Sequence, residues 1–299
     1  MTASFEPKSI PAITWNNMLP PFEDHVYFEH RRAFPFQWTA SSFELVNAWW
    51  LSEAALLAYA DPAFARPRLL QAGFDNVWFL SGASTQCYVT AAEAGVIMAF
   101  RGTQGDPRAI EDFIADLRAD LDIRLVALDR GGSVHRGFNE ALDEVWPALA
   151  ALLQDESLSG RPFWITGHSL GGALAVLAAD RLERVQGIYT FGCPRVGDQA
   201  FVQRLNLPLY RFINNNDMVT HLPPFPYQDA GEMQYIDNEG RIHNHIDAWD
   251  RWLDEVQGHL HSFLAAFSNG LPALMPDGLK DHTPLLYALH IWNHLVHRV

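Results

Sequence analysis

The residue best suited to act as a nucleophile is Ser169, at the centre of the sequence GHSLG (residues 167–171). The apolar FWIT (163–166) before it predicts a buried strand, and ALAVLAADRL (173–182) after it predicts a helix. G-x-S-x-G between a strand and a helix is typical of a nucleophile elbow, a strained turn that lifts the serine above the sheet. Gly167 and Gly171 leave room for such a turn because they lack side chains. An ordinary glycine turn is the alternative, and the flanking strand and helix favour the elbow.

A nucleophilic serine needs a base, and the base needs an orienting acid. In proteins with this elbow the acid follows the serine in the chain and the histidine follows the acid. Asp217 comes after LYRFINN (209–215), whose alternating apolar residues predict a strand, and is the first candidate for the acid. Asp198 is the second candidate, although its place before QAFVQRL (199–205) is more typical of a helix N-cap.

Several histidines could supply the base. His282 lies in a loop just before the last predicted helix, where a loop can carry it over the edge of the sheet, and is the preferred candidate. His221 is close to Asp217 in sequence and is a less suitable partner. His243 and His245 alternate with Asp247, a weak metal-ligand pattern, and we expect neither a metal nor another cofactor. The remaining downstream histidines are expected to serve packing or the surface; they are His259, His261, His290, His294 and His297.

The elements that must position these residues alternate between short strands and helices. Residues 76–80, 85–92 and 95–102 predict a hairpin leading into a buried strand, and further strands are predicted at 161–167, 187–192 and 209–215. Helices are predicted at 41–60, 110–121, 137–155, 170–185, 246–267 and 284–298. Such alternation predicts an α/β fold with a mostly parallel central sheet and helices on both faces. We expect a single domain over residues 1–299, with residues 1–40 wrapped on its surface.

Composition excludes some classes of function. The formal net charge of −14 argues against nucleic-acid binding and against docking on anionic membranes, but not against neutral apolar surfaces. No apolar run approaches the roughly 18 residues of a transmembrane helix. Cys87 and Cys193 are too few for a disulfide framework, and we expect two buried thiols. No signal peptide is visible, which predicts a cytoplasmic location by default, or secretion if the chain is a mature form.

Seven strings of the chain, in the same order, resemble those of the class 3 lipases, the fungal-type triacylglycerol lipases of the α/β-hydrolase superfamily. They extend from about Val96 to Tyr287 and are VIMAFRGT, IEDFIADL, VHRGFNEA, WITGHSLGGALA, YTFGCPRVGD, NNNDMVTHLPP and KDHTPLLY. The resemblance implies the α/β-hydrolase fold, with Ser169 as nucleophile, Asp217 as acid and His282 as base.

The resemblance also implies an oxyanion hole. Its donors would be the N–H of Leu170, which the helix after the serine also predicts, and the hydroxyl and N–H of Thr103. Asp116 would hold the hydroxyl of Thr103 in place. In the family a short helix after the oxyanion string covers the site as a lid, and here residues 104–121 would form it. Ile110, Phe113 and Leu117 fall on one face of that helix, which is equally typical of a helix packed permanently on the core.

These residues predict a serine carboxylic-ester hydrolase that acts on neutral lipids, a triacylglycerol lipase or esterase, through an acyl-enzyme intermediate. Its partners would be lipid or ester substrates, with transient contact to a lipid–water interface. Monoacylglycerol lipase, phospholipase A1 and feruloyl-type esterase activities remain open within this class. The alternative from another class is a catalytically inactive lipid-binding or interaction module on the same fold.

Overall fold

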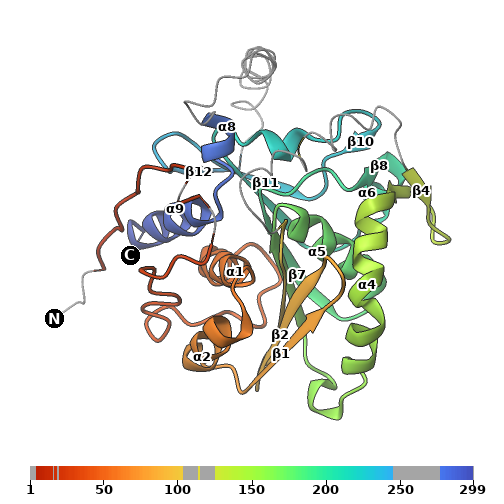
Figure 1. Ribbon diagram of the computed structural model, residues 1–299, viewed down its shortest axis with the longest axis horizontal. Helices are drawn as coiled ribbons and strands as arrows, with labels where there is room; N and C mark the ends of the chain where they lie inside the picture. Colours follow the sequence, from red (N-terminus) through yellow and green to blue (C-terminus); the bar gives the residue numbers. More distant parts are fainter. Residues whose placement is uncertain are drawn as a thin grey trace.

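A twisted sheet runs through the middle of the molecule in the computed structural model (Figure 1). The structure describes residues 5–298 except 16, 19, 104–113, 115–124 and 245–276. Within these residues the sheet has eight strands, and β3 to β11 run parallel in the order β3, β6, β7, β9, β11. The spatial order is β1 (Asn76–Ser81), β2 (Gln86–Ala92), β3 (Gly95–Phe100), β6 (Phe163–His168), β7 (Val185–Phe191), β9 (Leu209–Asn214), β11 (Glu232–Ile236) and β12 (Ile242–His243). The carboxyl ends of the parallel strands therefore meet at one edge, where open α/β sheets bind ligands.

Helices cover both faces of the sheet (Figure 1). On one face lie α1 (Leu45–Leu57), α2 (Pro62–Ala72) and α9 (Pro284–Val296), and on the other lie α4 (Arg136–Leu152) and α5 (Leu170–Arg181). Shorter helices are η1 (Glu156–Leu158), α6 (Gln199–Arg204), η2 (Met218–His221) and α8 (Asp277–Lys280). A small antiparallel sheet joins β4 (Leu125–Ala127), β5 (Ser133–His135), β8 (Gly197–Asp198) and β10 (Tyr227–Gln228). The predicted fold class, α/β-hydrolase with a mostly parallel sheet between helices, is confirmed.

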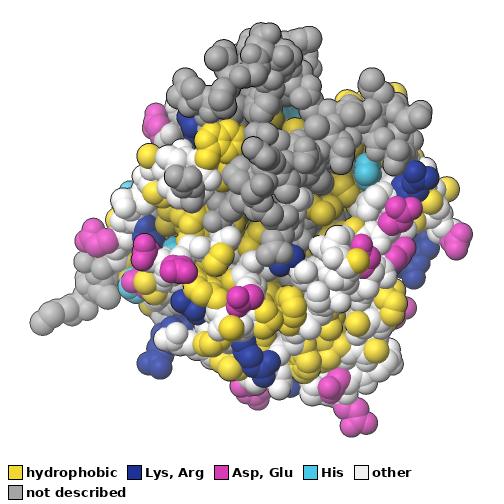
Figure 2. All heavy atoms as spheres, viewed as in Figure 1, with side chains coloured by type: hydrophobic (Ala, Val, Ile, Leu, Met, Phe, Trp, Pro, Cys, Tyr) yellow, Lys and Arg dark blue, Asp and Glu magenta, His cyan; other side chains and the backbone are white. Residues whose placement is uncertain are grey.

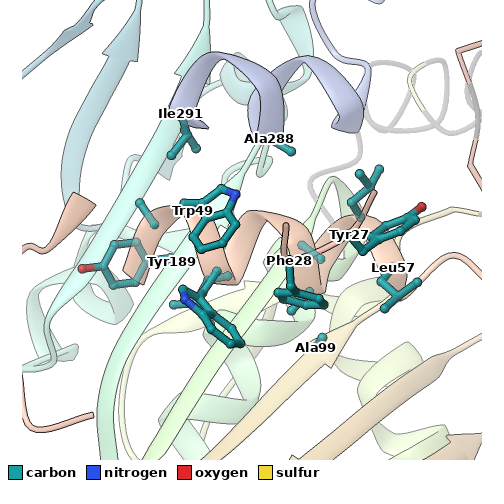
Figure 3. Close-up of a cluster of buried hydrophobic side chains, with 14 of the residues drawn as sticks. Tyr27, Phe28, Trp49, Leu57, Ala99, Tyr189, Ala288 and Ile291 are labelled. Atoms are coloured by element: carbon teal, nitrogen blue, oxygen red, sulfur yellow. The ribbon is translucent and has the colours of Figure 1, made fainter. Parts of the chain in front are cut away.

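Each face of the sheet has its own apolar cluster. On the α1 side, Trp49 lies between Tyr189 of β7 and Ala288 and Ile291 of α9 (Figure 3). The rings of Trp49 and Trp292 are 5.3 Å apart between centroids, so aromatic contacts join α1 to α9. On the other side, the alanines and leucines of α5 pack against β3, β6 and α4. These two clusters fix the ends of β6, β9 and α9, from which the site is built.

Most predicted elements are present, with shifted ends. The helix predicted at 170–185 ends at Arg181 because Val185 already belongs to β7. Helix α2 was not predicted, since its sequence has weak apolar periodicity and contains Pro67, yet Asp61 caps it by accepting the N–H of Phe64 at 2.9 Å. Strand β11 was also missed. The helices predicted at 110–121 and 246–267 lie outside the described residues, Ile114 excepted.

Residues 1–40 were expected to lie on the surface, and that expectation is wrong for part of the segment. The described residues of 5–40 form no helix or strand, but Phe28, Phe34 and Phe36 are buried in the cluster that contains Trp49. Their burial explains the aromatic richness of the segment, which has no helical or strand periodicity to reveal its inward side chains.

Charged side chains are spread over the surface. On the face shown in Figure 2, acidic and basic side chains of the described residues are interspersed among apolar ones and form no single charged patch. Cys87 and Cys193 are both buried and unpaired, as predicted. None of the described helices is long and apolar enough to cross a membrane.

Candidate active site

The sequence GHSLG forms a strained turn between β6 and α5. Ser169 has a φ of 57° and a ψ of −132°, a conformation that L residues rarely adopt. A Cβ on Gly167 would lie 2.2 Å from the carbonyl carbon of Gly171, and a Cβ on Gly171 would lie 2.3 Å from the carbonyl oxygen of Phe100. Only glycines fit at these two positions, so the turn has the geometry of the nucleophile elbow that the sequence predicts.

The turn brings Ser169 to His282 and Asp217. The Nε2 atom of His282 lies 2.9 Å from Oγ of Ser169, and its Nδ1 atom lies 2.8 Å from Oδ2 of Asp217. All three residues are buried, with exposed fractions of 3% for Ser169, 2% for His282 and 0% for Asp217. Asp217 follows β9 and His282 precedes α9, so His282 meets Ser169, 113 positions before it in the chain, at the carboxyl edge of the sheet.

Tyr287 is a further contact of the acid that the sequence did not reveal. Its hydroxyl donates to Oδ2 of Asp217 at 2.6 Å and accepts the N–H of Asn214 at 3.0 Å. Burial, together with the charge of Asp217, raises the pKa of Tyr287 well above its usual value, which keeps the hydroxyl protonated as a donor. Tyr287 lies on the first turns of α9, and its spacing of five residues from His282 is the only signal in the sequence.

A second buried network holds the backbone of His282. The Nε2 atom of His168 lies 2.7 Å from the carbonyl oxygen of His282, and its Nδ1 atom lies 2.7 Å from the hydroxyl of Tyr59. Burial lowers the pKa of His168 well below its usual value, and the neighbouring His282 lowers it further, so this imidazole is neutral. A carbonyl only accepts, so Nε2 of His168 carries the proton and Nδ1 accepts from Tyr59.

Thr103, one of the expected oxyanion donors, lines a small cavity at Ser169. Its lining includes Met18, Tyr59, Thr103, Ser169, His282 and Pro284. The hydroxyl of Thr103 is buried and has no hydrogen-bond partner among the described residues. Leu170 begins α5, and the first N–H groups of a helix have no acceptor within the helix. Asp116, expected to hold Thr103, lies outside the described residues.

The alternative residues have other environments. Asp198 accepts the N–H of Phe201 at 2.8 Å and so caps α6, as the sequence favoured. His221 lies in η2; burial, and next the charges of Arg195 and Arg211, lower its pKa to about 4. The Nε2 atom of His243 lies 2.8 Å from Oδ2 of Asp237. His245, Asp247, His259 and His261 lie outside the described residues.

Comparisons with known proteins agree with this geometry. Residues 97–227 match the model of the family described as lipase (class 3). A lipase from Rhizomucor miehei is 36% identical over 160 residues, which cover 48% of this chain and 42% of the relative. This part of the chain is therefore similar to the class 3 lipases. The family match includes Thr103, Ser169 and Asp217 but ends before His282. The position of His282 in the site is therefore supported by its contact with Ser169 and not by the family match.

A solved structure of a lipase shares the fold. It is a triacylglycerol lipase whose catalytic centre is described as a serine protease triad, and it is 28% identical with a TM-score of 0.56, covering 68% of this chain and 84% of that one. Another relative, the secreted mono- and diacylglycerol lipase 1 of Fusarium solani, is 36% identical over 117 residues, covering 36% of this chain and 35% of the relative. These matches span less than half the length of the curated relatives named here. The default expectation of a cytoplasmic location receives no support from a relative that is described as secreted.

Proposed function

We propose that the chain is a carboxylic-ester hydrolase in which Ser169, His282 and Asp217 form a catalytic triad. The observation that carries the proposal is the continuous line of contacts from Asp217 Oδ2 through both ring nitrogens of His282 to Ser169 Oγ, with distances of 2.8 Å and 2.9 Å. The line ends at a cavity that Thr103 also lines, whose hydroxyl has no hydrogen-bond partner among the described residues.

In the acylation step, Oγ of Ser169 forms a bond to the ester carbonyl carbon while Nε2 of His282 accepts its proton. The carbonyl oxygen gains negative charge and accepts hydrogen bonds from Thr103 and from the N–H of Leu170. Collapse of this intermediate breaks the bond to the alcohol oxygen, which takes the proton from His282. Asp217 stabilises the imidazolium through Nδ1, and the hydroxyl of Tyr287 donates a hydrogen bond to the carboxylate of Asp217.

In the deacylation step, a water molecule gives a proton to Nε2 of His282 and attacks the acyl carbon. The bond between that carbon and Oγ of Ser169 then breaks, Oγ recovers the proton, and the carboxylic acid leaves. His282 therefore acts as base and then as acid in each half of the reaction. Its backbone carbonyl stays in place because His168 donates to it.

The proposed substrates are esters of neutral lipids, as acted on by the relatives named mono- and diacylglycerol lipase and triacylglycerol lipase. The net charge of −14 supports neutral over anionic lipid surfaces, because like charges repel. We also propose that the enzyme works outside the cell, on the support of the secreted Fusarium relative. Fractionation of the producing organism into cells and medium tests that location.

The proposed lid at residues 104–121 is supported by its amphipathic sequence and by the burial of Ile114 within the core cluster that contains Met18. If the segment opens on lipid, the rate should jump as a sparingly soluble ester passes its solubility limit. A smooth saturation curve through that limit would contradict the lid.

The experiment that tests the proposed activity is an ester panel of graded chain length with a phospholipid included. We expect hydrolysis of neutral esters, and a loss of roughly 10³-fold or more in kcat for His282→Ala with the fold retained. Absence of hydrolysis across the panel would favour the alternative, a lipid-binding module. Near-normal turnover of His282→Ala would contradict the assignment of the base.

A further inference from the structure

Among the described residues that line the cavity at Ser169 is Met18, 151 positions before the serine in the chain. Met18 comes from the N-terminal segment and is 1% exposed. Met18 belongs to the same apolar cluster as Phe100 and Ile114. The other lining residues named above either belong to the proposed catalytic machinery or are next to it, so Met18 has no assigned part in the chemistry.

The described residues of 10–18, which we call the N-terminal strap, lie between two anchored residues of the chain, Lys8 and His25. On one side the N–H of Lys8 donates to Oδ1 of Asn293 at 2.6 Å, and Nδ2 of Asn293 donates back to the carbonyl of Lys8 at 2.8 Å. On the other side the ring of His25 lies 3.0 Å from the carboxylate of Glu53.

Between these anchors the strap touches the rest of the protein through apolar side chains. Its hydrogen bonds join strap residues to one another, as from the N–H of Thr14 to Oδ1 of Asn17 at 2.6 Å. Within the described chain none of them reaches outside the strap. Ile13 and Trp15 pack against the cluster that buries Met18. A segment held by apolar contacts between fixed ends shifts at low cost compared with one held by buried hydrogen bonds.

We propose that Met18 is a specificity-determining residue that limits the length of the apolar chain that reaches Ser169. The side chain of methionine is unbranched and adapts to irregular gaps, so a small shift of this side chain admits a short ester. A long chain must displace Met18 and the strap from their apolar contacts. The inference rests on the proposed function, because it concerns the substrate of the same serine.

The test compares the long-chain to short-chain ratio of kcat/KM in two series, p-nitrophenyl esters with growing acyl chains and acetate esters with growing alcohols. Met18→Ala should raise this ratio about tenfold in at least one series, corresponding to room for about two further methylene groups. Met18→Phe, which keeps the site apolar but fills more space, should lower the ratio. Because the two substitutions should change the ratio in opposite directions, the result distinguishes a steric limit from a general loss of folding.

Met233→Ala is the matched control, since Met233 lies on β11 and not at the cavity. It should leave the ratio unchanged. Equal changes for all esters, or no change in either series for both Met18 variants, would overturn the role of Met18 while hydrolysis itself persists. Absence of hydrolysis in the unaltered protein would instead overturn the proposed function, so the two failures are distinguishable.

Discussion

The hydroxyl of Tyr287 lies 2.6 Å from Oδ2 of Asp217, the same oxygen that accepts from the ring of His282. Asp217 is fully buried, and a buried carboxylate costs free energy unless donors surround it. Its other oxygen accepts the N–H of Val219 at 3.0 Å, so three donors fix the orientation of the acid. Tyr287 is therefore a positioning residue, which acts on Ser169 through Asp217 and His282.

Replacing Tyr287 by phenylalanine removes one donor to a charged group and leaves the ring in place. We expect the free energy of unfolding to fall by about 2 kcal/mol, and kcat to fall about tenfold with little change in KM. Urea denaturation and steady-state kinetics measure the two effects. Tyr88→Phe is the matched control, because the hydroxyl of Tyr88 donates to the carbonyl of Ala60 at 2.8 Å, away from the cavity. It should lose stability and keep kcat, and an equal loss of kcat in both variants would refute a positioning role for Tyr287.

Thr103 offers a buried hydroxyl without a partner among the described residues, which suits a donor that is used only in the transition state. Thr103→Val keeps the shape and removes the hydroxyl, and should lower kcat by about 10²- to 10³-fold. Thr103→Ser keeps the hydroxyl and should retain most of the activity. If both variants have the same kcat, the hydroxyl is not an oxyanion donor.

The backbone at Gly192 lies close to the side chains of Asp217 and His282. It has a φ of +58°, and a Cβ there would lie 2.8 Å from Oδ2 of Asp217 and 2.9 Å from Nδ1 of His282. Gly192→Ala should separate the acid from the base and lower kcat/KM about 100-fold or more.

Gly131→Ala is the control for this variant, because Gly131 has a φ of +93° and a Cβ added there would meet no described atom within 4 Å. Both variants should lose about 1 kcal/mol of stability from the positive φ, but Gly131→Ala should keep full activity. A normal kcat/KM in Gly192→Ala would show that the triad tolerates displacement there.

The buried histidines predict how stability depends on pH. Burial lowers the pKa of His168 well below its usual value and that of His221 to about 4, whereas an unfolded chain titrates near 6.5. Below about pH 6.5 the unfolded state therefore binds protons that the folded state does not, and the free energy of unfolding falls by about 1.4 kcal/mol per pH unit for each such histidine. Urea denaturation between pH 7.5 and pH 5 measures this slope. A free energy of unfolding that stays constant or rises as the pH falls from 7.5 to 5 would contradict the neutral state of both rings.

The sequence predicted those parts of the fold and site whose signal is local or periodic. The strand, glycines and helix around Ser169 are contiguous, and apolar alternation located β9 and hence Asp217. Tyr287, Tyr59 and His168 act through contacts between distant segments. His168 and Tyr287 lie within GHSLG and KDHTPLLY, but no pattern in these strings reveals which residues they contact. The same holds for Met18 and for the aromatic residues of 27–36, which are buried by tertiary packing without any regular period.

Ser169 is the proposed nucleophile, and covalent labelling with a fluorophosphonate followed by intact-mass measurement tests this role. We expect one adduct per chain, located by peptide mapping to the GHSLG sequence and absent from Ser169→Ala. An adduct of the same yield on Ser169→Ala, or one mapped to another residue of the unaltered protein, would refute the role of Ser169.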